Sequence, residues 1–156
     1  MIGYLAGPIA HDDNCQEWRD KIIESCPSMD WYDPLTSGKG HGDYKDRLTE
    51  IKKNLDNGDS SEFKVLREIV NEKIIPDDIT AISNCDFLVA YIKKGIRVWG
   101  TICEIFYMKC ILKKEVFLIT ELSFSEMNNW ELGLCDGIFT SVDEFIEFVN
   151  SDAQEE

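Results

Sequence analysis

The chain has 156 residues, a length typical of one domain, and its hydrophobic fraction of 44% is enough for a sizeable core. Thirty acidic residues against 16 basic ones give a net charge of −14, which argues against binding to a nucleic-acid backbone but leaves a small nucleotide open. No apolar run approaches the ~18 residues of a transmembrane helix, and the amino-terminal stretch lacks the length and the basic start of a signal peptide.

Short apolar runs alternate with helical patterns along the chain. The runs predict strands at 1–7, 29–33, 86–92, 115–120 and 137–141. Helical patterns lie at 12–26, in a short helix opened by Pro76-Asp77-Asp78, in a helix that begins near Thr101, in a loop or short helix at 123–136, and at 142–150. Because the strands are continuous apolar runs, they predict a parallel sheet covered on both faces. We therefore expect an α/β fold with a single-domain, doubly wound, flavodoxin-like or Rossmann-like sheet of about five parallel strands.

The highly charged segment 44–75 interrupts this alternation. Two amphipathic helices separated by residues 57–60 fit it best, and we predict a solvated helical hairpin inserted over one rim of the fold. The expected domain spans residues 1–151, and residues 152–156 are expected to be a frayed tail.

The six cysteines are scattered, without a Cys-x-x-Cys pair, and several lie inside apolar segments. Such cysteines are typical of buried side chains in a reducing compartment, so we expect a cytoplasmic protein. Neither His11 nor His41 has ligand spacing with a cysteine, which predicts that there is no metal site. The chain lacks a Gly-x-Gly-x-x-Gly fingerprint and a P-loop, and no cofactor is expected.

Ligands of a doubly wound sheet bind at the edge where the strands end and the following helices begin. Element order alone brings to that edge the segment Tyr4 to Pro8, Asp33, Asp78, Glu104, and Asn128 with Asn129. Asp86 precedes the third strand, so it belongs to the opposite edge and is expected to be structural.

Glu104 has two interpretations. Thr101 could be an N-cap, with Glu104 at the third helical position closing a capping box. Alternatively, Glu104 faces a cleft, is held ionised by the helix dipole, and acts as a nucleophile. Its place at the ligand edge favours the second interpretation.

The other candidates also have structural alternatives. Asp77 and Asp78 could cap a helix, and the Asp33-Pro34 pair is common in turns. Tyr4 could be a core residue, and Asn128-Asn129 could be only a loop. The residue types alone leave these alternatives open.

An ordered set of motifs runs along most of the chain outside 44–75. It consists of YLAGPI with Trp18-Arg19 downstream, a strand ending at Asp33-Pro34, Asp78-x3-Ile82-x3-Asp86 leading into FLVAY, Gly100-Thr101-x2-Glu104, EVFLI, and the ending SVDEFIEFV. This set resembles the nucleoside 2-deoxyribosyltransferases with their phage-type and nucleotide N-glycosidase relatives.

The resemblance implies an enzyme that acts on the N-glycosidic bond of a 2′-deoxynucleoside and exchanges its base. Glu104 would attack the anomeric carbon and form a covalent glycosyl-enzyme, from which a second base or water takes the sugar. Asp78 would handle the proton of the nucleobase, and Tyr4 would orient the nucleophile. Substrate contacts are expected from Gly7, Pro8, Asp33, Gly100, Thr101, Asn128 and Asn129.

Two departures from the family's pattern concern the base and the acceptor. Val98 stands where an acid is often found about six residues before the nucleophile, and a carboxy-terminal Asn, often supplied by a neighbouring subunit, has only approximate matches in Asn128 or Asn129. The chain could instead be an N-glycosidase that hydrolyses a nucleoside 5′-monophosphate, or a sensor that binds nucleotides without turnover. Lys39, His41 or Arg97 could then meet a phosphate. The resemblance also implies a homo-oligomer that binds a small nucleoside or nucleotide. From charge and hydropathy, neither a nucleic acid nor a membrane is expected as a partner.

Overall fold

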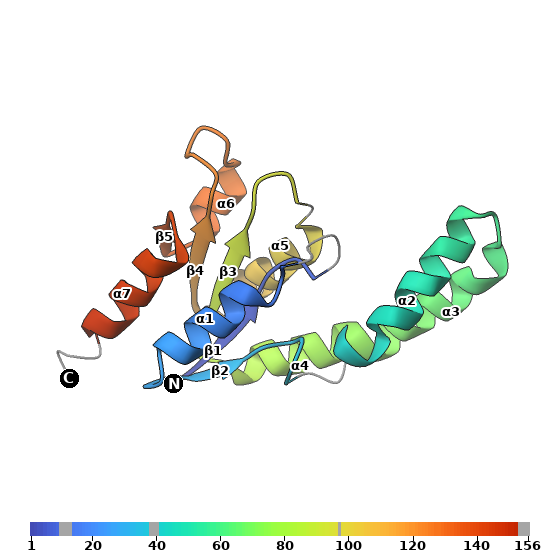
Figure 1. Ribbon diagram of the computed structural model, residues 1–156, viewed down its shortest axis with the longest axis horizontal. Coiled ribbons are helices and arrows are strands. Elements are labelled where there is room, and N and C mark those ends of the chain that lie inside the picture. Colours follow the sequence, from blue (N-terminus) through green and yellow to red (C-terminus); the bar gives the residue numbers. More distant parts are fainter. Residues whose placement is uncertain (10–13, 38–40, 97, 153–156) are drawn as a thin grey trace.

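The computed structural model describes residues 1–9, 14–37, 41–96 and 98–152. In this part of the chain, five strands form one parallel sheet in the order β2-β1-β3-β4-β5 (Figure 1). The strands are β1 (Ile2–Ala6), β2 (Asp30–Tyr32), β3 (Phe87–Ile92), β4 (Glu115–Thr120) and β5 (Gly137–Phe139). The predicted α/β class and the sheet of five parallel strands are confirmed.

The sheet is covered on both faces, as its continuous apolar strands predict. On one face, α1 (Glu17–Ser25) and α7 (Val142–Asp152) contribute Trp18, Ile22 and Phe145 to a core cluster with Leu5 of β1. On the other face lie α4 (Ile75–Asn84), α5 (Trp99–Phe106) and α6 (Asn129–Leu134). Tyr4 belongs to the cluster on that second face because successive side chains of a strand point to opposite sides.

The strand order creates one switch point. From β1 the chain passes through α1 to β2 on one side, and it then returns to β3 on the other side of β1. Tyr4 pairs with Tyr32 of β2 and with Leu88 of β3 in the sheet register. The carboxyl ends of β1 and β3 are therefore the place where this class of sheet binds its ligands.

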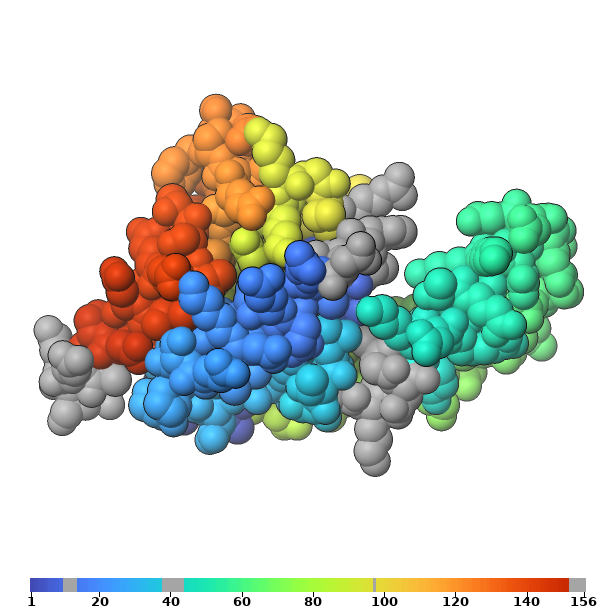
Figure 2. Space-filling model, in the orientation of Figure 1, coloured from blue at the N-terminus to red at the C-terminus, as the bar shows by residue number. Residues whose placement is uncertain are grey.

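Residues 41–74 form a two-helix arm that extends away from the sheet (Figure 1), and in the space-filling view it is a separate lobe (Figure 2). The arm consists of α2 (His41–Asp56), the 3₁₀ turn η1 (Ser60–Glu62), α3 (Phe63–Ile69) and the π-helical segment η2 (Val70–Ile74). The helical hairpin is confirmed, but it projects outward instead of lying over a rim, and its first helix already begins at His41. Among residues 44–74, only Ile51 and Ile74 are buried, so the arm has little core of its own.

The helix of Asp77 and Asp78 begins earlier than predicted, because α3, η2 and α4 follow one another without a break. The N–H of Ile75 bonds to the carbonyl of Val70, five residues back, which is the spacing of a π-helix. This wider turn precedes Pro76, whose ring would clash with a carbonyl four residues back in a regular helix. Asp77 and Asp78 therefore do not stand at a free helix start, and their interpretation as caps is wrong.

Other boundaries shift modestly. The first helix begins at Glu17, five residues later than predicted, and α5 continues into a second π-helical segment, η3 (Tyr107–Ile111). No helix within the described ranges is long and apolar enough to cross a membrane. The last four residues of the expected tail, 153–156, lie outside the description.

Candidate active site

Tyr4 and Glu104 meet at the switch point of the sheet. The Tyr4 hydroxyl donates a hydrogen bond of 2.7 Å to Oε1 of Glu104. Tyr4 is fully buried in the middle of β1, and Glu104 is partly exposed on α5. Tyr4 is therefore both a core residue and a direct neighbour of the candidate nucleophile.

The capping box between Thr101 and Glu104, which was the alternative interpretation, does not form. Helix α5 begins at Trp99, and its N-cap is Val98, whose carbonyl accepts a 2.9 Å hydrogen bond from the N–H of Ile102. Thr101 is already inside the first turn and buried, so the prediction that it caps the helix is wrong. Glu104 consequently lies in the second turn, beyond the reach of the helix start, and its carboxylate meets Tyr4 instead.

Tyr32 and Asp78 complete this cluster. The Tyr32 ring stacks on the Tyr4 ring, with centroids 5.6 Å apart and planes inclined by 10°. Burial first, and then the carboxylates of Glu104 and Asp78, raise the pKa of Tyr4 well above its usual value. Burial and the charge of Asp78 also raise the pKa of Tyr32. The charge of Asp78 on α4 therefore acts on both phenols of the stacked pair.

A second polar cluster contains Arg19 and Asp33, and both side chains are almost completely buried. The Arg19 Nε and Asp33 Oδ1 atoms are 3.4 Å apart. The guanidinium also donates to the carbonyls of Gly7 (3.0 Å) and Cys15, and it lies over the Trp18 ring. Burial lowers the pKa of Arg19, and the charge of Asp33 opposes that shift. One cation thus joins the end of β1, the start of α1 and the end of β2.

The oxygens of Asp33 are occupied within the protein. Oδ2 accepts hydrogen bonds from the Gln16 amide at 2.7 Å and the Thr36 hydroxyl at 3.0 Å, and Oδ1 accepts from the N–H of Leu35 at 2.9 Å. The side chain is only 1% exposed. This arrangement favours the turn interpretation of Asp33-Pro34 over a direct contact with substrate.

Gly7 and Pro8 follow β1 at the ligand edge and are buried. A Cβ at Gly7 would lie 2.8 Å from Cζ2 of Trp18, closer than carbon atoms approach. Glycine is therefore required at position 7 by the close approach of the Trp18 ring, and its carbonyl is held by Arg19.

Gly100, Asn128 and Asn129 are exposed at the starts of α5 and α6. A Cβ at Gly100 would meet nothing within 4 Å. The Asn128 side chain caps α6 by accepting from the N–H groups of Trp130 and Glu131, and the Glu131 carboxylate accepts from the N–H of Asn128 in return. The chain thus has a capping box at α6 rather than at α5. Asn128 also lines a groove between α5 and α6 with Val98, Trp99, Ile102, Trp130 and Glu131.

Asp86 lies at the opposite edge, as predicted. Its Oδ2 accepts a 2.7 Å hydrogen bond from the N–H of Ile2, and its own N–H donates to the Ile2 carbonyl. It therefore anchors the start of β1 and is remote from the ligand edge.

Among the described residues, no group of three or more His, Cys, Asp or Glu side chains is arranged to hold a metal ion. Lys39 and Arg97, which could meet a phosphate in the alternative function, lie outside the described residues, as do His11 and the side chain of His41.

Two residues of these clusters were missed by sequence reasoning. Tyr32 directly precedes Asp33, and its place beside Tyr4 follows from the pairing of β1 with β2, which the sequence does not state. Arg19 was noticed only as part of a motif. Its full burial carries no sequence signal, because an arginine in an amphipathic helix is usually exposed.

No family model matches the chain, and no curated protein matches its sequence. Solved structures do match its fold. A CMP N-glycosidase from Clostridium botulinum is 14% identical with a TM-score of 0.53, and the match covers 96% of this chain and 99% of that one. A 2-deoxyribosyltransferase from Bacillus psychrosaccharolyticus is 16% identical with a TM-score of 0.59, covering 94% and 90%. A conserved protein from Enterococcus faecalis is 14% identical with a TM-score of 0.62, covering 97% and 98%. At these identities the likeness is one of fold.

Proposed function

We propose that this protein is an enzyme that cleaves the N-glycosidic bond of a 2′-deoxynucleoside and transfers the sugar to a second base, with Glu104 as nucleophile. The observation that carries the proposal is the 2.7 Å hydrogen bond from Tyr4 to Glu104 at the switch point of the sheet. Two solved structures with the same fold are described as a 2-deoxyribosyltransferase and a CMP N-glycosidase, which supports this class of reaction.

In the first half-reaction, a carboxylate oxygen of Glu104 attacks C1′ of the sugar. The C1′–N bond breaks, its electron pair stays on the base, and the base takes a proton from the Asp78 carboxyl group. A covalent deoxyribosyl ester of Glu104 and the free base result. Developing positive charge on the sugar is stabilised by the approaching carboxylate.

In the second half-reaction, a nitrogen of the acceptor base attacks C1′ and passes its proton to the Asp78 carboxylate. The C1′–O bond to Glu104 breaks, and the free carboxylate is restored. Two displacements at one carbon give retention of configuration. If water takes the place of the acceptor base, the same steps release the sugar.

Tyr4 acts as the positioning group in this scheme. Its raised pKa keeps the phenol protonated, so it remains a hydrogen-bond donor to Glu104. The stacked Tyr32 ring holds Tyr4 in place from the β2 side. A fixed donor restricts the rotation of the Glu104 carboxylate and keeps one of its oxygens oriented toward C1′.

The candidate substrate contacts form two groups, one exposed and one buried. We propose that the exposed starts of α5 and α6, with Gly100, Asn128 and Asn129, contact the nucleoside. The open space beside Gly100 supports a ligand at that position. Gly7, Pro8, Asp33 and Thr101 are buried, and in this proposal they shape the site from behind.

Hydrolysis of a nucleoside 5′-monophosphate is the second candidate. Val98, the N-cap of α5, provides no carboxylate where an acid would help to hold or deprotonate an acceptor base. The CMP N-glycosidase among the solved structures of this fold supports the same alternative.

One assay separates these functions. The protein is incubated with each deoxynucleoside and a different free base, and in parallel with CMP and dCMP, and the products are resolved by chromatography. A new nucleoside supports the transferase. Free base with sugar or sugar phosphate supports the hydrolase. Binding of a nucleoside or nucleotide without any product would make the protein a sensor, and would overturn the enzymatic proposal.

A further inference from the structure

The two stacked tyrosines differ in what their hydroxyls do. Tyr4 is fully buried, and its hydroxyl donates to Glu104 at 2.7 Å. Tyr32, the last residue of β2, is half-buried, and among the described residues nothing accepts a hydrogen bond from its hydroxyl. The rings, inclined by only 10°, project from paired positions of β1 and β2 to the same face of the sheet. The stacked pair thus combines one donor bound to the nucleophile with one donor that can serve another group.

Asp78 lies on the side of α4 that faces this pair. Ala81 and Ile82, three and four residues after Asp78, are buried in the core cluster that contains Tyr4 and against which Tyr32 packs. Residues three and four apart share one side of a helix, so Asp78 lies on that same side, one turn nearer to the start of α4. Its side chain is accordingly half-buried.

Asp78 also lies toward the same edge of the sheet as Tyr32. Helix α4 ends at Asn84, three residues before β3 begins at Phe87, so its end lies at the edge where the strands start. Its first turn therefore points toward the edge where the strands end and where Tyr32 closes β2. Burial raises the pKa of Tyr32 most, the charge of Asp78 comes next, and the charge of Asp77 adds less. Helix side, sheet edge and charge all relate Asp78 to the Tyr32 hydroxyl.

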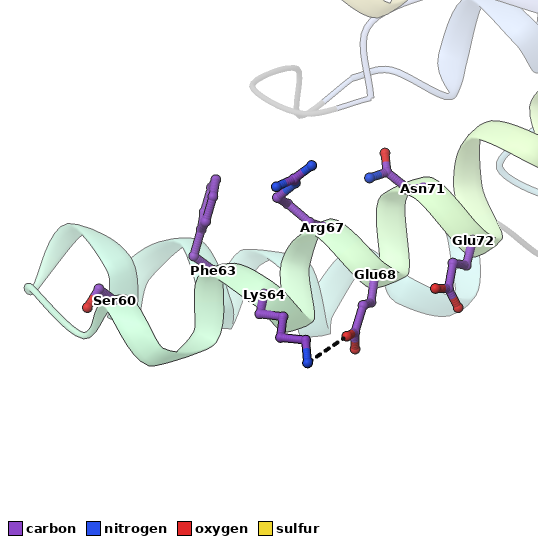
Figure 3. A pocket seen from close by; sticks show the side chains of 7 residues that line it. All are labelled: Ser60, Phe63, Lys64, Arg67, Glu68, Asn71 and Glu72. Atoms are coloured by element: carbon purple, nitrogen blue, oxygen red, sulfur yellow. Dashed lines mark ion pairs between the residues drawn. The ribbon is translucent and has the colours of Figure 1, made fainter.

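The first turn of α4 gives Asp78 no capping role. Figure 3 shows the helix running without a break from Phe63 past Glu72, on its way to α4. The N–H of Ile75 is bonded to the carbonyl of Val70 in that preceding turn, so no free helix start requires a carboxylate. An acidic side chain on the core side of a helix, without a cap to make, is a candidate for function.

We propose that Tyr32 is a positioning residue for Asp78, whose carboxyl group accepts a hydrogen bond from the Tyr32 hydroxyl while the leaving base takes its proton. This inference rests on the proposed function and extends it from the nucleophile to the leaving group. The proton passes from one Asp78 oxygen to the base as the C1′–N bond breaks, and the phenol keeps its own proton throughout.

The hydrogen bond from Tyr32 acts mainly in the transition state. Negative charge develops on Asp78 as its proton moves to the base, and a hydrogen bond to a charged acceptor is stronger than one to a neutral acceptor. The Tyr32 donor therefore stabilises the transition state of base departure more than the ground state. Each carboxyl group of the site then has its own phenol, with Tyr4 serving Glu104 and Tyr32 serving Asp78.

The first test compares substrates that differ in their need for a proton. The base of deoxyguanosine needs one to leave, whereas the base of 7-methyl-2′-deoxyguanosine already carries a positive charge and leaves as a neutral molecule. Tyr32→Phe should lower the turnover number about tenfold to a hundredfold for the first substrate and within about twofold for the second. If the protein accepts pyrimidines only, deoxyuridine should suffer a larger loss than 5-fluorodeoxyuridine, whose base leaves more easily as an anion.

The matched control is Tyr4→Phe, which removes a hydroxyl from the other ring of the stack. It acts through Glu104 on bond formation, so it should slow both members of a substrate pair by the same factor. If Tyr32→Phe also slows both members equally, or slows neither, the inference about Tyr32 is wrong and the proposed function still holds. A wild-type chain that turns over no nucleoside or nucleotide overturns the proposed function, and this inference with it.

The second test needs no turnover. The phenol of Tyr32 is titrated by NMR in protein with ring-labelled tyrosine, its resonance being identified by its loss in Tyr32→Phe. Asp78→Asn should lower the pKa of the Tyr32 phenol, because it removes the largest charge that raises it. Asp77→Asn, one residue away and exposed, is the control and should lower that pKa less. A Tyr32 pKa that Asp78→Asn leaves unchanged would show that the phenol and the carboxylate do not interact, and would overturn the inference.

Discussion

Tyr4 and Glu104 stand 100 residues apart in the chain, and a 2.7 Å hydrogen bond joins them. One is fully buried in β1, and the other lies in the second turn of α5. This contact excludes the capping-box interpretation of Glu104, because a carboxylate bound to Tyr4 is not closing a capping box on its own helix.

The first prediction concerns the nucleophile. Glu104→Gln keeps the size of the side chain and an oxygen that can accept from Tyr4, but it removes the charge that attacks C1′. Turnover is expected to fall by about a thousandfold or more, with the thermal unfolding temperature nearly unchanged. Release of free base, followed by chromatography, measures the effect. Wild-type activity in this variant would rule out Glu104 as the nucleophile.

The second prediction concerns the positioning group. Tyr4→Phe preserves the packing of the ring on Tyr32 and removes the donor to Glu104. The turnover number should fall about tenfold to a hundredfold while KM changes little, because the lost interaction orients the nucleophile rather than the substrate. A variant with raised KM and unchanged turnover number would instead make Tyr4 a substrate contact.

The third prediction follows from the raised pKa of Tyr4. A phenol whose folded pKa exceeds its unfolded value stabilises the fold fully below pH 10, and this contribution is lost as pH rises above that value. The pKa values of Tyr32, Cys85 and Cys135 are also raised, so the wild-type chain should lose stability gradually across the alkaline pH range. Urea unfolding between pH 8 and about pH 11 should show a shallower decline for Tyr4→Phe than for the wild type. Parallel declines in the free energy of unfolding of the two proteins would contradict a raised pKa for Tyr4.

The fourth prediction tests the buried pair of Arg19 and Asp33. Arg19→Met leaves the Asp33 carboxylate buried without its cation, and should lower the free energy of unfolding by about 3–5 kcal/mol. The double variant Arg19→Met with Asp33→Asn should lose less than the sum of the two single variants, since neither charge is then left alone. Lys21→Met breaks an exposed ion pair with Asp143 and serves as the control, with an expected loss within about 1 kcal/mol. Additive losses would mean that the two charges act separately.

The fifth prediction compares two glycines of the proposed site. Gly7→Ala drives a Cβ into the Trp18 ring and should cost about 1–3 kcal/mol of stability. Gly100→Ala adds a methyl group to open space in the first turn of a helix, so stability should be unchanged or slightly raised. If substrate approaches the α5 start, the same Gly100→Ala variant should raise KM. An unchanged KM would remove Gly100 from the substrate contacts.

The sheet and the edge at which its candidates meet were predictable because they depend on local patterns. Continuous apolar runs mark β3 and β4 nearly to the residue, and the alternation of strands and helices places Tyr4 and Glu104 at the same edge. The position of Asp86 at the other edge follows from the same reasoning, and its hydrogen bond to the start of β1 agrees with it.

The details that sequence reasoning missed depend on tertiary contacts. Thr101 has a suitable side chain for an N-cap, but the helix starts at Trp99, and no local rule favours Val98 as a cap. Pro76 ordinarily marks a helix start, yet the π-helical turn before it lets the helix continue. The burial of Arg19 depends on carbonyls at both ends of the loop after β1, which become neighbours only when the sheet has formed.

The unbroken helix from Phe63 to Asn84 has a mechanical consequence. Phe63 at the start of α3 and Asp78 in α4 belong to one run of helix, with no loop between them. A displacement of the arm therefore passes to Asp78 through the wider π-helical turn at Val70–Ile74.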